Sequence, residues 1–240
     1  MRRAPRIGLF GGTFDPIHRG HLRAARLVGR RFGLDRVLFI PACDPPHKER
    51  PDMVASRHRL RMVRLAVAGT PGWTASPIEI RAGGTSYSIR TIEAMRRTHP
   101  GARLFFIAGS DAFHEIKTWR NWRRVLNRCS FIVMTRPGRG LASAVSVLGP
   151  EFRSRIRRVG PRERIAGAGG EDGLIYLLSI PALPISSTDI RERAASGRPF
   201  ARRVPPAVAR YIRDHRLYRP ALGRFRPAIH SNARRLEPPR

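Results

Sequence analysis

The sequence has very few cysteines and no long apolar run. Only Cys43 and Cys129 carry thiols, which excludes a disulfide-stapled scaffold and favours reduced thiols in a cytoplasmic protein. The apolar run at residues 7–10 is too short for a signal peptide, and no run approaches the roughly 20 residues of a membrane helix. We therefore expect a cytoplasmic protein that has no membrane segment.

Lysine is also scarce. Of the 47 Lys and Arg residues only Lys48 and Lys117 are lysines, so arginine accounts for nearly all of the formal net charge of +30. A charge of this size suggests a partner such as nucleic acid. The arginines are dispersed along the chain, however, and their abundance beside Ala, Gly and Pro is typical of biased codon usage. We therefore favour a role for the charge in gathering anionic substrates such as nucleotides.

Length and composition favour one main domain. A chain of 240 residues that is 41% hydrophobic can bury a substantial core without metal or disulfide support. We predict a domain over residues 1–218, within which residues 139–173 form a variable surface segment. Residues 219–240 hold four prolines and six arginines, and we predict that they form a loosely ordered basic tail.

Apolar runs alternate with amphipathic stretches along most of the chain. Nearly continuous apolar runs predict buried strands, and apolar residues at helical spacing predict helices between them. This alternation predicts an α/β fold with a doubly wound, Rossmann-like parallel sheet that helices cover on both faces. The predicted strands are 6–10, 37–40, 104–107, 131–134 and 175–180, with weaker strand signals at 73–74 and 78–80; the predicted helices are 20–32, 57–68, 88–97, one containing Trp119 and Trp122, 186–195 and 206–214.

The strongest functional signal is at residues 11–21, Gly-Gly-Thr-Phe-Asp-Pro-Ile-His-Arg-Gly-His, between the first strand and the first helix. In an open parallel sheet this turn lies at the carboxyl edge, where ligands bind. The glycines let the backbone approach a phosphate, and the N–H groups at the helix start favour an anion. His18 and His21 face the same way on a helical turn and can donate hydrogen bonds to phosphate oxygens. The segment has neither the ending of a Walker loop nor the glycine spacing of a dinucleotide loop.

Polar residues near the end of the domain favour polyphosphate binding. Ser187 or Thr188 is predicted to cap the helix that carries Arg191, which would bring hydroxyls and a guanidinium to one helix start. Asp111 follows a buried strand, where its carboxylate could accept ribose hydroxyls or serve only as a helix cap.

Three other candidate residues also have a purely structural interpretation. Trp119 could stack on a flat ring of a ligand or could pack in the core. Lys48 could point at phosphates or be a solvated loop charge. Arg59 could belong only to a solvated helix face.

Six segments in order resemble the bacterial nicotinate-nucleotide adenylyltransferases, a family of the nucleotidyltransferase superfamily that carries a His-x-Gly-His motif. The likeness spans roughly residues 6–218. Three positions, Ser88, Arg90 and Arg120, differ from the residues usual in that family. The six segments are residues 11–22, the Pro-Pro-His-Lys loop at 41–48, Arg-Leu-Arg-Met at 59–62, Ser-Tyr-Ser at 86–88, Gly-Ser-Asp at 109–111 with Trp119, and Ile-Ser-Ser-Thr-Asp-Ile-Arg at 185–191.

The resemblance implies adenylyl transfer from ATP to nicotinate mononucleotide, which forms deamido-NAD and pyrophosphate in NAD biosynthesis. Since the sequence has no obvious carboxylate cluster, we expect Mg²⁺ to enter with ATP and no metal site on the protein. The implied catalytic residues are His18, His21 and Arg191; the implied ATP-binding residues are Gly12, Thr13, Phe14, Lys48, Gly109, Asp111, Ser187 and Thr188; the implied mononucleotide-binding residues are His47, Tyr87, Ser88 and Trp119.

Other functions stay open from the sequence. Another transferase of the superfamily, such as a phosphopantetheine adenylyltransferase or a cytidylyltransferase, is opposed by the Pro-Pro-His-Lys loop and by Trp119. A class I aminoacyl-tRNA synthetase would need tRNA-binding domains, for which the chain is short. A basic nucleic-acid-binding protein would show salt-sensitive affinity for DNA or RNA. The oligomeric state, including a homo-oligomer, does not follow from the sequence.

Overall fold

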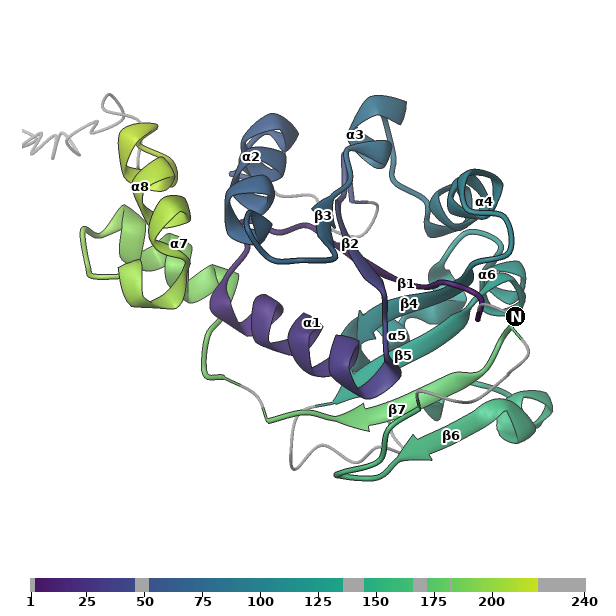
Figure 1. Ribbon diagram of the computed structural model, residues 1–240. Helices are drawn as coiled ribbons and strands as arrows, with labels where there is room; N and C mark the ends of the chain where they lie inside the picture. The colour runs from purple at the N-terminus through teal and green to yellow at the C-terminus, as the bar shows by residue number, and fades with distance from the viewer. Residues whose placement is uncertain (1–2, 46–51, 136–144, 166–171, 182, 220–240) are drawn as a thin grey trace, which may run out of the picture.

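A computed structural model describes residues 3–45, 52–135, 145–165, 172–181 and 183–219 (Figure 1). Seven parallel strands form one sheet in the order β3-β2-β1-β4-β5-β7-β6. The order reverses between β1 and β4, as in a doubly wound Rossmann-like sheet, so the predicted fold is confirmed. The strands are β1 Arg6–Gly12, β2 Arg36–Pro41, β3 Trp73–Ala75, β4 Arg103–Gly109, β5 Ser130–Thr135, β6 Ile156–Val159 and β7 Ile175–Ser179.

Helices follow most strands and cover both faces of the sheet (Figure 1). Near the carboxyl end, α8 packs against α2, which brings the last described segment close to the first half of the chain. The helices are α1 Arg19–Phe32, α2 Ser56–Val67, α3 Ile78–Ala82, α4 Ser88–Thr98, α5 Ser110–His114, α6 Trp122–Arg128, α7 Ser187–Ala195 and α8 Pro206–Asp214, and the 3-10 turns are η1 Ile116–Thr118, η3 Pro150–Arg155 and η4 Ala201–Arg203.

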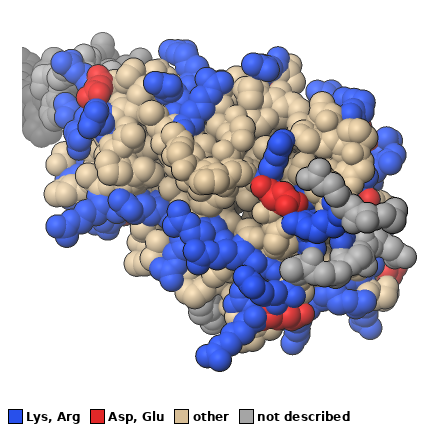
Figure 2. Space-filling model, in the orientation of Figure 1, with Lys and Arg blue, Asp and Glu red and all other residues tan. Residues whose placement is uncertain are grey.

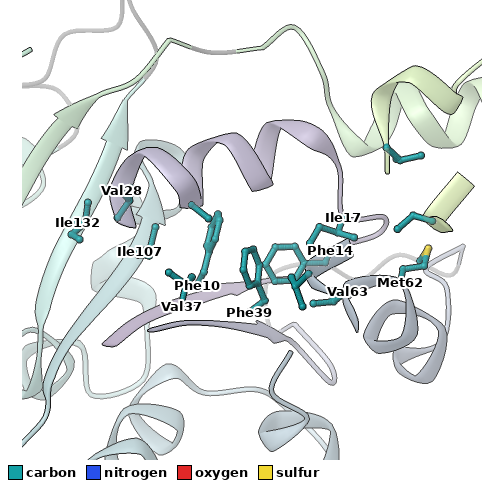
Figure 3. Packing of buried hydrophobic residues seen from close by; sticks show 14 of the residues in the cluster. Phe10, Phe14, Ile17, Val28, Val37, Phe39, Met62, Val63, Ile107 and Ile132 are labelled. Carbon is teal, nitrogen blue, oxygen red and sulfur yellow. The ribbon is translucent and has the colours of Figure 1, made fainter. Parts of the chain in front are cut away.

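Two apolar clusters, one on each face, hold the helices to the sheet. Val37 and Phe39 of β2 belong to the first cluster, which packs against α1, α2, α7 and α8 (Figure 3). Leu38 and Ile40 of the same strand belong to the second, which packs against α4, α5 and α6. Successive residues of a strand point to opposite faces, so a strand that is buried on both faces appears as a continuous apolar run.

The weak strand signal at residues 78–80 was a wrong prediction, because this segment is the first part of helix α3. Pro77 precedes the helix, and Gly83 ends it at a positive φ of 68°, which favours glycine. Ile-Glu-Ile alternates in polarity, but three residues are too few to separate strand from helix periodicity.

The predicted helix containing Trp119 and Trp122 needs correction, and one strand was not predicted. Trp119 lies between η1 and α6, and Trp122 begins α6, because Asn121 in the left-handed conformation (φ 54°) breaks the helix between them. Part of the segment 139–173 forms β6, an edge strand paired with β7. Arg157 and Arg158 of β6 are exposed, so this strand lacks the apolar run that identified the others. The predicted tail 219–240 lies outside the described residues except for Arg219.

Positive side chains are spread over the face shown in Figure 2 and are not gathered in one patch. Arg19, Arg23, Arg26 and Arg30, for example, are exposed along the length of α1. Charge that is distributed in this way raises the potential of the whole surface toward anions. None of the helices in the described segments is long and apolar enough to cross a lipid bilayer.

Candidate active site

Two adjoining cavities open where the strand order reverses, at the carboxyl ends of β1 and β4. The first, of about 450 Å³, contains His18 and His21, and we call it the histidine cavity. The second, of about 410 Å³, contains Tyr87 and Trp119, and we call it the aromatic cavity. Gly11 and Gly109, at the ends of the two strands, line both cavities. Ligand sites of open α/β sheets lie at this reversal point.

His18 and His21 lock each other in place at the start of α1. The His21 N–H donates to His18 Nδ1 over 3.3 Å, and the His18 N–H donates to His21 Nδ1 over 3.2 Å. The two rings stack with their centroids 3.7 Å apart. Because each Nδ1 accepts a hydrogen bond, a neutral imidazole here carries its proton on Nε2. The pair is therefore built to present two N–H donors.

Gly20 is required by this arrangement. A Cβ at this position would lie 2.9 Å from both Cε1 and Nδ1 of His18, which is closer than side chains approach each other. The glycine in His-x-Gly-His thus leaves room for the His18 ring, which is only 7% exposed.

Phe14 takes a different place from the one predicted. Its side chain is 3% exposed and packs in the first cluster, edge-on to the His21 ring at 5.2 Å between centroids (Figure 3). The predicted contact with ATP can therefore come only from the Phe14 backbone. The Phe14 side chain instead packs against the His21 ring from within the core.

The start of α7 forms one wall of the histidine cavity. Ser186, not Ser187 or Thr188 as predicted, caps the helix by accepting the Asp189 N–H over 3.0 Å. This leaves Ser187 to donate to the carbonyl of Pro16 over 2.9 Å, which joins α7 to the turn between β1 and α1. Ser187 and Thr188 both line the cavity.

Arg191, on the same helix, is directed at the β1–α1 turn. Its Nη1 donates to the Asp15 carbonyl over 2.8 Å, and its Nη2 donates to the Thr188 hydroxyl over 3.2 Å. The geometry places a guanidinium beside the turn and next to a wall of the cavity that holds the two histidines. The resemblance implied that Arg191 acts together with His18 and His21; in the structure it contacts the turn that precedes them and is not among the residues that line the two cavities.

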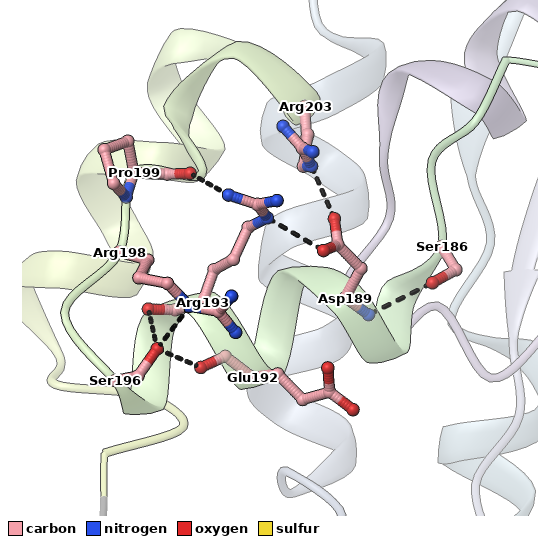
Figure 4. A network of polar contacts seen from close by, with 8 residues as sticks. All are labelled: Ser186, Asp189, Glu192, Arg193, Ser196, Arg198, Pro199 and Arg203. Atoms are coloured by element: carbon pink, nitrogen blue, oxygen red, sulfur yellow. Dashed lines mark hydrogen bonds and ion pairs between the residues drawn. The ribbon is translucent and has the colours of Figure 1, made fainter.

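Asp189 anchors α7 through polar contacts with two arginines (Figure 4). Its carboxylate accepts hydrogen bonds from Arg203 and Arg193, and these bonds lower the pKa of Asp189. The ion pair with Arg203 holds α7 to the turn that contains η4, the ion pair with Arg193 lies within α7, and the buried Ile190 holds the helix to the core. The helix start that faces the cavity is thereby fixed.

The predicted ATP-binding residues divide between the two cavities. Gly109 and Asp111 line the histidine cavity together with the α7 residues, whereas Gly12 and Thr13 line the aromatic cavity. At Gly109 a Cβ would meet no atom within 4 Å, so a side chain there would protrude into space that both cavities share. Asp111 lies exposed in the first turn of α5, after Gly109 as the capping residue.

The predicted mononucleotide-binding residues Tyr87, Ser88 and Trp119 come together in the aromatic cavity. The Trp119 ring is half-buried and rests edge-on against Phe106 with centroids 5.6 Å apart. This contact fixes the indole while it still lines the cavity, as a stacking platform requires. Core packing and ligand stacking, which the sequence offered as alternatives, are both compatible with this position.

Glu79 also lines the aromatic cavity, and sequence reasoning missed it. Burial raises the pKa of its carboxyl, while hydrogen bonds from Thr91, over 2.6 Å, and from Ser86 oppose this rise. Ser86 in turn accepts the Cys43 N–H over 2.8 Å. In the sequence, Glu79 stands between two isoleucines, and this alternation was interpreted as a strand and not as part of a site.

Arg59 was also misjudged, because the structure buries it completely instead of placing it on a solvated face. Its guanidinium donates to the carbonyls of Thr13 (2.9 Å), Ala42 (2.6 Å), Cys43 (2.7 Å) and Val54 (2.9 Å). Burial lowers the pKa of Arg59, and the carboxylate of Asp15 opposes this effect. The side chain ties the turn between β1 and α1 to the loop that follows β2.

Tyr218 reaches the same turn from the end of the domain. Its hydroxyl donates to Asp15 Oδ1 over 2.9 Å, and burial raises the pKa of this phenol. The sequence offered no signal for this contact, since the two residues are 203 positions apart.

Two predicted site residues, His47 and Lys48, lie outside the described residues. Among the residues that the structure does describe, no three His, Cys, Asp or Glu side chains gather as a metal site would require.

The chain is similar to known proteins over most of its length. A family model described as cytidylyltransferase-like matches residues 9–193. A protein from Pelobacter propionicus named as a nicotinate-nucleotide adenylyltransferase is 44% identical over 213 residues, which cover 89% of this chain and 98% of the relative. A protein of the same name from Symbiobacterium thermophilum is 41% identical over 216 residues, which cover 89% and 95% of the two chains.

Solved structures share the fold at lower sequence identity. Two structures of a Plasmodium falciparum nicotinic acid mononucleotide adenylyltransferase, one complexed with APC and one with NaAD, have TM-scores of 0.64 and 0.66. Their sequences are 16% and 17% identical to this chain, and each comparison covers 89% of this chain and 97% of the other. At this identity the likeness establishes the arrangement of strands and helices.

Proposed function

This chain belongs to the nicotinate-nucleotide adenylyltransferase family of cytidylyltransferase-like proteins, and on that premise we propose that it transfers the adenylyl group of ATP to nicotinate mononucleotide. The products are deamido-NAD and pyrophosphate, as in NAD biosynthesis. The observation that carries the proposal is the stacked His18–His21 pair at the reversal point of the sheet, beside a cavity that contains Trp119. ATP occupies the histidine cavity, and the pyridine mononucleotide occupies the aromatic cavity.

The two cavities meet at the strand ends, which suits a reaction between the two substrates. A phosphate oxygen of the mononucleotide attacks the α-phosphorus of ATP, the bond from this phosphorus to the bridging oxygen breaks, and pyrophosphate leaves. The nucleophile is already ionised, so the enzyme needs no general base. Catalysis then consists of holding both phosphates in line and stabilising the charge that develops on the oxygens.

Donors on both sides of the histidine cavity supply that stabilisation. The Nε2–H groups of His18 and His21 are assigned to the α- and β-phosphate oxygens, since Nδ1 of each ring is occupied. The start of α7 and Arg191 are assigned to the β- and γ-phosphates. Lys48 is assigned to the same phosphates from the sequence. Mg²⁺ enters with ATP in this proposal and offsets part of the polyphosphate charge.

The acceptor assignment predicts a preference for nicotinate mononucleotide over nicotinamide mononucleotide. The two differ in a carboxylate against a neutral amide, and a charge-assisted hydrogen bond to a carboxylate contributes about 1.5–3 kcal/mol. We expect a preference of roughly tenfold or more in kcat/KM. The measurement is pyrophosphate release with each acceptor at saturating ATP and Mg²⁺.

A Trp119→Ala variant tests the stacking platform in the same assay. We expect KM to rise for both acceptors, since both carry the pyridine ring, with less effect on KM for ATP. Trp122→Ala is the matched control, because Trp122 packs against Phe152 and does not line the cavity.

The acceptor preference has its own test in the wild type. Equal efficiency with both acceptors, or a preference for the amide, would overturn the assignment of the acceptor and leave adenylyl transfer intact.

Arg191→Ala is expected to weaken the use of ATP by raising its KM and lowering kcat. The reason is the position of the guanidinium at the first turn of α7, where it also donates to the Asp15 carbonyl. Arg191→Lys should recover only part of the loss, since an ammonium cannot make the forked contact with phosphate oxygens. Steady-state kinetics with varied ATP provide the check. ATP kinetics that are unchanged in a folded Arg191→Ala protein would refute the assignment.

A further inference from the structure

Arg120 brings a positive charge to the aromatic cavity. This residue follows Trp119 directly and lines the cavity together with Tyr87 and Ser88. It does not line the histidine cavity, where the phosphates of ATP are assigned. Within the described segments, Arg120 forms no ion pair with a carboxylate. Its guanidinium therefore has donors to offer to an anionic ligand.

Tyr87 holds this guanidinium in position. The Cζ atom of Arg120 lies 4.9 Å from the centroid of the Tyr87 ring, within the range of a cation–π contact. Tyr87 comes directly before α4, whose first residue, Ser88, also lines the cavity. A cation that is stacked on a fixed aromatic ring loses less side-chain freedom when it binds an anion than a mobile surface arginine would.

The aromatic cavity also contains acidic residues, against which the positive charge of Arg120 acts. Glu79 and Glu115 also line it and would repel a carboxylate on the ligand if ionised. Burial raises the pKa of Glu79, which favours its neutral form. In the described lining of the aromatic cavity, Arg120 is the only Lys or Arg side chain.

We propose that Arg120 is a specificity-determining residue, whose guanidinium pairs with the ring carboxylate of the acid acceptor and so favours it over the amide. This inference rests on the proposed function. A carboxylate and a guanidinium form charge-assisted hydrogen bonds, whereas a carboxamide has no charge to contribute. The mononucleotide phosphate is the other anion that Arg120 could meet, but it must lie where the cavities join in order to react.

Arg90 provides a matched control. Its Cζ atom lies 5.3 Å from the same Tyr87 ring, but Arg90 does not line the cavity. Arg120→Met and Arg90→Met each remove one positive charge near the Tyr87 ring. Only Arg120→Met removes a hydrogen-bond donor from the aromatic cavity. A comparison of the two separates direct contact with the ligand from the general positive potential of the surface.

The experiment measures kcat/KM for nicotinate mononucleotide and nicotinamide mononucleotide in the wild type and in both variants, and binding of each acceptor by calorimetry without ATP. We expect Arg120→Met to lose about tenfold in kcat/KM and in affinity for the acid, as one charge-assisted contact provides. For the amide we expect a change within roughly twofold, and Arg90→Met should change neither acceptor by more than that.

Three results would overturn the inference. Equal losses for both acceptors in Arg120→Met would assign the residue to the shared phosphate or to the structure of the cavity. Unchanged kcat/KM for both acceptors in Arg120→Met would exclude it as a determinant, and an equal effect of Arg90→Met would assign the effect to general charge. A wild-type protein that releases no pyrophosphate with either acceptor would instead refute the proposed function, and the inference with it. If the wild type releases pyrophosphate and Arg120→Met keeps the wild-type preference for the acid, only the inference about Arg120 is refuted, and the proposed function stands.

Discussion

Replacing His21 with alanine is expected to lower turnover by about 10²–10³-fold, as removal of one preorganised donor to a developing oxyanion typically does. The structure gives this donor a defined state, because His21 Nδ1 accepts the His18 N–H and a neutral ring then carries its proton on Nε2. Both kcat and kcat/KM should fall, since the contact is made mainly in the transition state. Single-turnover measurement of pyrophosphate release reports the chemical step directly.

Folding must be separated from chemistry in this variant. His21→Ala also removes an acceptor at the start of α1, and loss of such a cap costs about 1 kcal/mol, which leaves the protein folded. His99→Ala is the control, since His99 ends α4 and lines neither cavity. The double variant His18→Ala, His21→Ala should be little worse than His21→Ala, because stacked groups that act as a unit are not additive. Near-normal turnover in a folded His21→Ala protein would remove the histidine from the mechanism.

The second large effect is expected at Arg59, on stability. Substitution by methionine keeps much of the side-chain volume but leaves the carbonyls of Thr13, Ala42, Cys43 and Val54 without this donor. A buried acceptor left without its donor costs about 1–3 kcal/mol, so with several carbonyls affected we expect the free energy of unfolding to fall by about 3–5 kcal/mol. Urea denaturation at constant pH measures it.

The same substitution should harm activity below the unfolding temperature. Thr13 lines the aromatic cavity, and the Cys43 N–H is held by Ser86 in the Ser-Tyr-Ser step, so Arg59 connects the turn between β1 and α1 with the aromatic cavity. Arg59→Lys should restore part of the stability and part of the turnover, because an ammonium keeps the charge but not the planar fork. Recovery by lysine distinguishes positioning from simple filling of space.

Arg61→Met serves as the control for both measurements. Arg61 lies on the same helix and is exposed, so its substitution should change the free energy of unfolding by no more than about 0.5 kcal/mol. If Arg59→Met were no more harmful than Arg61→Met, the buried network would have no share in stability or in the arrangement of the site.

The burial of Arg59 could not be predicted from the helix periodicity of the sequence. Arg57, Arg61 and Arg64 are exposed on α2, as their spacing between apolar residues of an amphipathic helix implies. Arg59 has the same residue type and a similar apolar neighbourhood in sequence, so pattern alone placed it with the other arginines. Its burial depends on carbonyl groups from two loops that lie beside α2 only in the folded sheet.

The site residues divide in the same way. The pairing of His18 with His21 and the need for Gly20 between them follow from geometry within one turn, and the motif predicted their common direction. The choice of Ser186 as the cap of α7 was missed, because Ser187 is drawn away by the Pro16 carbonyl, 171 residues earlier in the chain. Several adjacent hydroxyls can cap a helix equally well until a distant partner takes one of them.

The sequence by itself determined the features whose physical causes lie within a few residues. These are the buried strands of continuous apolar character, the amphipathic helices, the glycine turn and the His-x-Gly-His pair, and together they were enough to predict a doubly wound parallel sheet with a phosphate site at its carboxyl edge. Only the tertiary structure decided the edge strand β6, the bond from Tyr218 to Asp15, the burial of Arg59 and the place of Arg120 beside Tyr87. Each of these depends on contacts between segments far apart in the chain, and no local periodicity records which segments the strand order will bring together.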